Sequence, residues 1–82
     1  MEITWEADAE IAVRIENGGV TVSANRAGLR SLARQLAALA EEAPGAHIHY
    51  DADNSLEEGS AEMIIEKIGR VPSRRATGGT ER

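Results

Sequence analysis

The sequence is short of the residues that support several common kinds of site. It contains no cysteine, which excludes disulfide bonds, thiolate metal centres and cysteine nucleophiles. It contains no phenylalanine and only 2% aromatic residues, so its core must consist mainly of aliphatic side chains. Charged residues interrupt the longest helix-like apolar stretch, which excludes a transmembrane helix, and the N-terminus lacks the basic segment of a secretory signal. We therefore expect a cytoplasmic protein with no membrane contact.

The charge is distributed unevenly along the 82 residues, whose net charge is −5. The first 68 residues carry thirteen acidic and five basic side chains, whereas the last fourteen carry one acidic and four basic side chains. An acidic body disfavours nucleic acid as a ligand, because neutralising phosphates requires a basic surface. It favours a basic protein partner through electrostatic steering, although a net charge of this size also keeps a small protein soluble.

Apolar and polar residues alternate over residues 2–16, with the apolar ones at odd positions and Ala12 as the exception. This period of two predicts sheet with one face exposed to water, and its length requires a bend, bulge or turn near residues 7–9. Asn17-Gly18 then predicts a type I′ hairpin, because both residues tolerate a positive φ. The resulting register places apolar residues of both strands on one face, pairing Ile15 with Val20, Val13 with Val22 and Ile11 with Ala24.

One helix is predicted, with Asn25 as its cap and Arg26 as its first residue. It runs for roughly 17 residues until Pro44 and Gly45 end it. Its apolar residues recur at helical spacing and form one broad stripe: Leu29, Leu32, Ala33, Leu36, Leu39, Ala40 and Ala43. Residues 46–51 and 62–68 then read as strands on either side of an acidic loop, with Met63 and Ile65 facing inward.

These elements predict an α+β fold in the order β-β-β-α-β-β, a two-layer sandwich with one helix packed on one face of an antiparallel sheet of four to five strands. Residues 1–68 form this single domain, and residues 69–82 form a disordered basic C-terminal tail. The expected core contains Ile3, Trp5, Ile11, Val13, Ile15, Val20, Val22, Leu29, Leu32, Leu36, Leu39, Ile48, Tyr50, Met63 and Ile65. The other sheet face has no helix to cover it, so it is either solvated or the surface through which a homodimer forms.

His47-x-His49-x-Asp51 places two imidazoles and a carboxylate on one strand face, about 7 Å apart at each step. Carboxylates of neighbouring strands, from Glu16, Glu62 or Glu66, could complete a small zinc-binding module. The alternative, which we favour, is a solvated polar face or a surface for partner contact. No nucleophile motif accompanies these residues, so we expect no catalytic residues, no enzyme activity and no bound cofactor or metal.

Arg26, Arg30 and Arg34 follow one flank of the predicted helix at a spacing of four. Like charges at this spacing cost an isolated helix about 0.2–0.5 kcal/mol per pair, so some other contact should offset the repulsion. The flank is either a ridge that binds an anion or a partner, or a set of arginines paired with nearby acids. We favour the pairing, because acidic residues are numerous.

Four short motifs follow one another between Gly28 and Ile68. They are Gly28-Leu29-Arg30-Ser31-Leu32-Ala33, His47-Ile48-His49-Tyr50-Asp51, Leu56-Glu57-Glu58-Gly59-Ser60 and Glu62-Met63-Ile64-Ile65-Glu66-Lys67. In this order and spacing the chain resembles the immunity protein 32 family of bacterial polymorphic toxin systems. The resemblance implies a small α+β protein that neutralises a cognate toxin by binding it, and it supplies no catalytic residues.

Besides the arginine flank, the predicted helix packing leaves two surfaces open, the uncovered sheet face and the acidic loop. If the partner is a basic toxin, these two surfaces supply the expected contact residues: His47, His49, Asp51, Asp53, Glu57, Glu58, Glu62, Ile64 and Glu66. Two other functions compete with toxin binding. One is the metal-binding module centred on His47, His49 and Asp51, and the other is a stand-alone homodimeric interaction domain.

Overall fold

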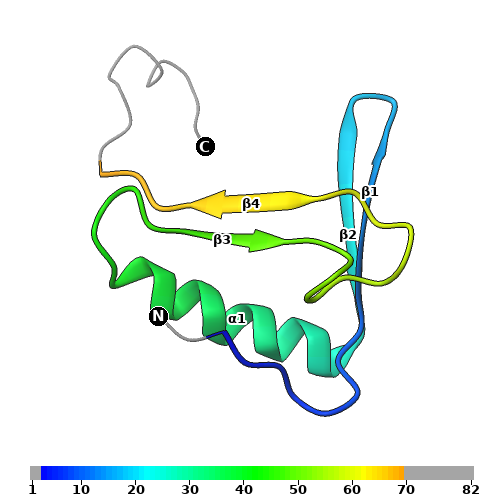
Figure 1. Ribbon diagram of the computed structural model, residues 1–82, viewed down its shortest axis with the longest axis horizontal. Coiled ribbons are helices and arrows are strands. Elements are labelled where there is room, and N and C mark those ends of the chain that lie inside the picture. The colour runs from blue at the N-terminus through cyan, green and yellow to red at the C-terminus, as the bar shows by residue number, and fades with distance from the viewer. Residues whose placement is uncertain (1–2, 70–82) are drawn as a thin grey trace.

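The computed structural model describes residues 3–69, in which four strands and one helix follow the order β-β-α-β-β. The elements are β1 (Ile11–Glu16), β2 (Gly19–Ala24), α1 (Arg26–Ala40), β3 (His47–Tyr50) and β4 (Met63–Glu66). They form two separate antiparallel sheets, β1–β2 and β3–β4. Figure 1 shows the β1–β2 hairpin standing crosswise to β3–β4, with α1 running along β3. Within this part of the chain, no helix has the length and apolar character needed to cross a membrane.

The α+β class is confirmed, whereas the single sheet of four to five strands is wrong. Strand β1 pairs with β2 along one edge, and its other edge is hydrogen-bonded to the loop before β4. The amides of Glu57 and Ala61 donate to the carbonyl oxygens of Ile11 and Val13 at 2.8 and 2.9 Å. The Val13 amide donates to Ser60 Oγ at 3.2 Å. This loop occupies the place beside β1 that another strand would need, so the two hairpins remain separate sheets.

The β1–β2 hairpin has the predicted register, with Val13 opposite Val22 and Ile15 opposite Val20. Asn17 and Gly18 adopt φ values of 51° and 79°, as a type I′ turn requires. Only the half of the hairpin nearer the helix is covered, however. Ile11 and Val13 are buried, whereas Ile15 and Val20 are 62% and 63% exposed. The turn sequence therefore determines the register of the hairpin, but the core does not extend to the residues next to the turn.

Residues 3–10 form no strand, so the first strand of the predicted order is also wrong. A turn at residues 7–8, where Asp8 adopts a φ of 65°, confirms the expected bend and ends the extended stretch. The segment runs beside α1 in the opposite direction. Gln35 Nε2 donates to the Thr4 carbonyl oxygen at 2.8 Å, and the Glu6 amide donates to Ser31 Oγ at 2.9 Å. Helix side chains thereby satisfy backbone groups that a neighbouring strand would otherwise pair.

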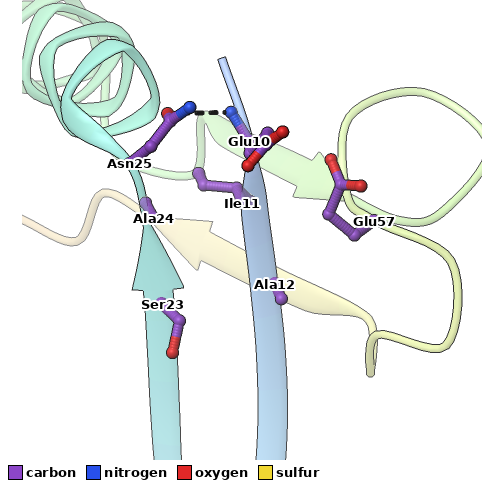
Figure 2. Close-up of a pocket in the computed structure, with 7 residues that line it drawn as sticks. All are labelled: Glu10, Ile11, Ala12, Ser23, Ala24, Asn25 and Glu57. Atoms are coloured by element: carbon purple, nitrogen blue, oxygen red, sulfur yellow. Dashed lines mark hydrogen bonds between the residues drawn. The ribbon is translucent and has the colours of Figure 1, made fainter. Parts of the chain in front are cut away.

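The predicted cap of α1 also ties the N-terminal segment to the helix. Asn25 Oδ1 accepts from the Gly28 amide at 2.8 Å, as an N-cap does, and from the Glu10 amide at 3.0 Å. Its Nδ2 donates to the Asp8 carbonyl oxygen at 2.8 Å. Figure 2 shows Asn25 bonded to Glu10 where β1 begins beside the end of β2. One amide side chain therefore fixes the start of the helix and the start of the hairpin together.

The buried side of α1 differs from the predicted leucine stripe. The fully buried helix residues are Gly28, Ser31, Gln35 and Leu39. Leu32 packs partly against the core, whereas Leu29 and Leu36 are 55% and 39% exposed. The helix is rotated relative to the predicted orientation because Ser31 and Gln35 face inward and bond to the backbone of the N-terminal segment. Hydrophobic spacing alone would have turned the leucines inward.

The core is smaller than predicted and includes one unexpected residue. Ile11, Val13, Leu39, Ile48, Tyr50 and Leu56 are buried, and Trp5, Leu32, Met63 and Ile65 pack against them. The inward placement of Met63 and Ile65 is thus confirmed. The predicted core residues that are instead exposed are Ile3, Ile15, Val20, Val22, Leu29 and Leu36. Leu56 belongs to the acidic loop and was not predicted, because only the bonding of this loop to β1 brings it inward. Apart from Gly69, the predicted tail lies outside the described residues.

We predict that Gly28→Ala destabilises the protein by about 1–3 kcal/mol, because a Cβ at this position would collide with the Glu10 carbonyl oxygen. Alanine normally stabilises a helix by about 1 kcal/mol relative to glycine, so the collision reverses the usual sign. Urea denaturation measures the change. Ala37→Gly, at an exposed position of the same helix, is the control and should cost about 1 kcal/mol through propensity alone. A stabilised Gly28→Ala variant would contradict the close approach.

Tyr50 generates a second prediction because it is completely buried, at 0% exposure, with its hydroxyl donating to Gln35 Oε1 at 2.8 Å. Burial raises the pKa of its phenol above the ordinary value of 10.0. The unfolded chain therefore ionises first on going to alkaline pH. Stability contributed by the neutral phenol is fully present below about pH 10 and is lost as the pH rises through the folded pKa.

The sequence contains one tyrosine, so the phenolate absorbance reports Tyr50 alone. We expect this absorbance to appear above pH 10 and to coincide with a fall in the free energy of unfolding. Tyr50→Phe removes the titrating group, and its stability should vary less over the same pH range than that of the parent protein. A phenol that titrates at its ordinary pKa in the folded protein would show that Tyr50 is accessible to water.

Candidate functional site

The outer face of β3–β4 carries five of the predicted contact residues. His47 and His49 come from β3, Ile64 and Glu66 from β4, and Glu62 directly precedes β4. The register places His47 opposite Glu66 and His49 opposite Ile64. All five side chains are exposed, and Ile64 is 61% exposed. The structure therefore gathers these residues on one face, as the alternation of the two strands predicts.

The acidic loop that follows β3 is organised by Asp51. Asp51 Oδ1 accepts from the amides of Asp53 and Asn54 at 3.0 and 3.1 Å. Its carbonyl oxygen accepts from the amides of Ser55 and Leu56 at 3.0 and 2.9 Å. Asp51 is half-buried and shapes the turn, whereas the side chains of Asp53, Glu57 and Glu58 are exposed. The loop thus presents three carboxylates to solvent.

The predicted group of His47, His49 and Asp51 does not come together as expected. His49 Nε2 lies 4.0 Å from Asp51 Oδ2 and 3.5 Å from Glu62 Oε1. Among residues 3–69, His49, Asp51 and Glu62 form a group whose potential ligand atoms all lie within 4.8 Å of one another. His47 is outside this group, and its Nδ1 lies 3.3 Å from the Gly45 carbonyl oxygen. Strand β3 ends at Tyr50, so the chain turns Asp51 back toward His49 while the two histidines stay apart along the strand.

A hollow of about 290 Å³ lies beside β3 and was not predicted. Apolar side chains from two parts of the chain contribute to it, together with polar groups from β3 and the acidic loop. Its lining residues are Ile3, Trp5, His47, Ile48, His49, Tyr50, Asn54 and Ser55. Such a combination suits an apolar side chain inserted by a partner. Sequence patterns do not reveal this hollow, because it depends on the docking of residues 3–6 against the helix.

A second hollow, of about 300 Å³, lies at the base of the β1–β2 hairpin. Figure 2 shows Glu10 beside Asn25 at the end of the helix, Ile11 and Ala24 at the adjoining ends of β1 and β2, and Glu57 on the loop on the other side of β1. The Glu10 amide and the Asn25 side chain on its wall are already bonded to each other. Glu57 is the one predicted contact residue that lines this hollow. The hollow therefore lies apart from the outer face of β3–β4.

Two of the three arginines on the predicted flank, Arg30 and Arg34, pair with nearby groups, as the favoured interpretation predicts. Arg30 Nε lies 3.0 Å from Glu6 Oε2, and Arg34 Nη1 lies 3.5 Å from the same oxygen. Arg34 Nη2 also donates to the Thr4 carbonyl oxygen at 3.0 Å. These two arginines hold the N-terminal segment on the helix, which gives the arginine flank a role within the fold.

Comparison with known proteins identifies a family. Residues 19–68 match the model of a family described as immunity protein 32. The matched stretch runs from β2 to just beyond β4, and it includes all nine predicted contact residues. No curated protein and no solved structure matches the chain significantly.

Proposed function

The chain belongs to the immunity protein 32 family, and we propose that it neutralises a cognate bacterial toxin by binding it directly, without catalysing a reaction. Family membership implies the immunity role and a toxin as partner. The observation that carries the proposal is the match over residues 19–68, because this stretch contains the whole outer face of β3–β4 and the acidic loop. We place the action in the cytoplasm, where the toxin would be met before export.

The charge of this surface supports a basic region on the toxin. Residues 47–66 contain six carboxylates and neither lysine nor arginine. Asp53, Glu57 and Glu58 are exposed on the loop, Glu62 is exposed just before β4, and Glu66 is exposed at the far end of β4. Clustered charge of one sign attracts an oppositely charged partner over about one Debye length, roughly 8–10 Å at physiological salt, and raises the rate of encounter. The acidic surface therefore supplies steering rather than most of the final affinity.

The same surface also offers apolar area for close contact. Ile64 lies opposite His49 in the β3–β4 register and is well exposed. The hollow beside β3 adds Ile3 and Trp5 next to the two histidines. Tight protein complexes combine a few apolar or aromatic anchors with a polar rim. We propose that Ile64 and this hollow form the centre of the contact and that the carboxylates form its rim.

The direct test is co-expression with the toxin domain encoded beside the gene. We expect growth to be restored and a stoichiometric complex to survive size-exclusion chromatography. The protein purified alone, measured by sedimentation, tests the competing use of the surface as a homodimer interface. Growth inhibition that persists despite soluble expression of both proteins would overturn the proposal.

We predict that Asp53→Lys combined with Glu57→Lys slows association with the toxin by about tenfold or more, because steering contributes roughly 10–1,000-fold to association rates. The dissociation rate should change less, and the effect should shrink as salt rises. Stopped-flow or surface plasmon resonance kinetics at two salt concentrations measure these rates.

The matched control is Glu16→Lys combined with Glu41→Lys, which changes the net charge equally at exposed positions on the β1–β2 hairpin and beyond the end of α1. We expect a much smaller loss of association rate from this pair. Equal losses from both pairs would mean that only net charge matters and would place the interface elsewhere. Both double variants should retain the thermal stability of the parent protein, because all four side chains are exposed.

A further inference from the structure

We propose that His49, Asp51 and Glu62 form a zinc site at the end of the β3–β4 hairpin, with a fourth coordination position open to solvent. The three residues come from β3, from the turn after it and from the residue before β4, and their potential ligand atoms lie within 4.8 Å of one another. The proposal concerns the free protein. It does not depend on the identity of the toxin or on toxin binding.

One separation between the ligand atoms matches a tetrahedral ion, and a second is a few tenths of an ångström longer. Zinc binds imidazole nitrogen at about 2.0–2.1 Å and carboxylate oxygen at about 2.0–2.2 Å, which places two ligands of a tetrahedron roughly 3.3–3.6 Å apart. His49 Nε2 and Glu62 Oε1 are 3.5 Å apart, within this range. His49 Nε2 and Asp51 Oδ2 are 4.0 Å apart, so a few tenths of an ångström of side-chain movement completes the contact.

One of the three ligands is already held in place. Asp51 Oδ1 accepts two backbone amides at 3.0 and 3.1 Å, and this leaves Oδ2 directed toward His49. Partners of this kind orient carboxylate ligands in metal sites and limit the entropy lost on binding. Glu62 is 72% exposed and free to rotate toward the ion. The site thus combines one anchored carboxylate with one adaptable carboxylate.

The donor set selects zinc over the commoner hard cations. Calcium and magnesium prefer six or more oxygen ligands, whereas three ligands that include an imidazole suit zinc with water in the fourth position. Two carboxylates also balance the double positive charge of the ion. An oxygen of each carboxylate lies within 4.8 Å of the other, and a bound cation would offset the repulsion between the two negative charges.

The chain contains its own internal control at the other end of the same face. His47 and Glu66 are the same residue types as His49 and Glu62, they are also exposed, and the register places them opposite each other. They lack a third ligand corresponding to Asp51, and within residues 3–69 they belong to no ligand group. Zinc bound at the proposed site should therefore depend on one histidine and not on the other.

The test is a calorimetric titration of zinc chloride into the full chain, purified without an affinity tag and freed of metal. We expect one site with a dissociation constant on the order of micromolar. His49→Ala and Glu62→Gln should each weaken binding by about tenfold or more, whereas His47→Ala and Glu66→Gln should change it by less than about twofold. Magnesium chloride at the same concentration should give no heat. Nuclear magnetic resonance of the imidazole nitrogens should show zinc shifting His49 and leaving His47 unchanged.

The pH dependence of zinc binding gives a further test. A metal-bound imidazole must be neutral, so a zinc site with a histidine ligand binds the ion less tightly on acidification. We expect the zinc affinity to fall between pH 7.5 and pH 5.5. The proposal is overturned if zinc produces no heat up to about millimolar concentration, or if His47→Ala weakens binding as much as His49→Ala. Because the zinc titration contains no toxin, either result leaves the proposed immunity function untouched.

Discussion

Two polar side chains of α1, Ser31 and Gln35, hold the N-terminal segment, and the rest of the structure depends on this contact. Both are buried inside a small protein, where an unpaired polar group would be costly. Gln35 donates to the Thr4 carbonyl oxygen and accepts from the Tyr50 hydroxyl, so it joins the segment, the helix and β3 in one chain of hydrogen bonds. Trp5 is thereby placed edge-on to Tyr50, with ring centroids 6.1 Å apart. This packing supports the inner face of β3, whose outer face carries the candidate site.

The parts of the fold that sequence predicts are those set by neighbouring residues. Asn17-Gly18 determines the hairpin register because the turn and the apolar face agree, and Asn25 with Pro44 marks the extent of the helix to within a few residues. The number of sheets and the buried side of α1 could not be predicted in the same way. Both depend on long-range hydrogen bonds: the side chains of Ser31 and Gln35, rather than a neighbouring strand, bond to the backbone of residues 4–6. A leucine stripe is the stronger signal in the sequence, but the polar contacts decide the rotation.

In the candidate site, too, the features set by neighbouring residues were predictable and those set by long-range contacts were not. The outer face of β3–β4 follows from an alternation of two residues, so the positions of His47, His49 and Ile64 were predictable. Which histidine meets the carboxylates was not, because this depends on where β3 ends and how Asp51 turns the chain. The hollow beside β3 was also beyond sequence reasoning, since it joins residues about 45 positions apart in the chain.

The hydrogen bonds between β1 and the acidic loop mean that the residues matched by the family model do not include all the residues that hold the fold together. The family match begins at Gly19, the first residue of β2, so β1 and the N-terminal segment precede it. Yet β1 contributes Ile11 and Val13 to the core and the carbonyl oxygens to which the acidic loop is anchored. Expressed alone, residues 19–68 would keep the carboxylates of the loop but lose the backbone that positions them. The stretch that matches the family model is therefore shorter than the stretch whose contacts build the core and anchor the loop, and a fragment cut at the bounds of the match would lack β1.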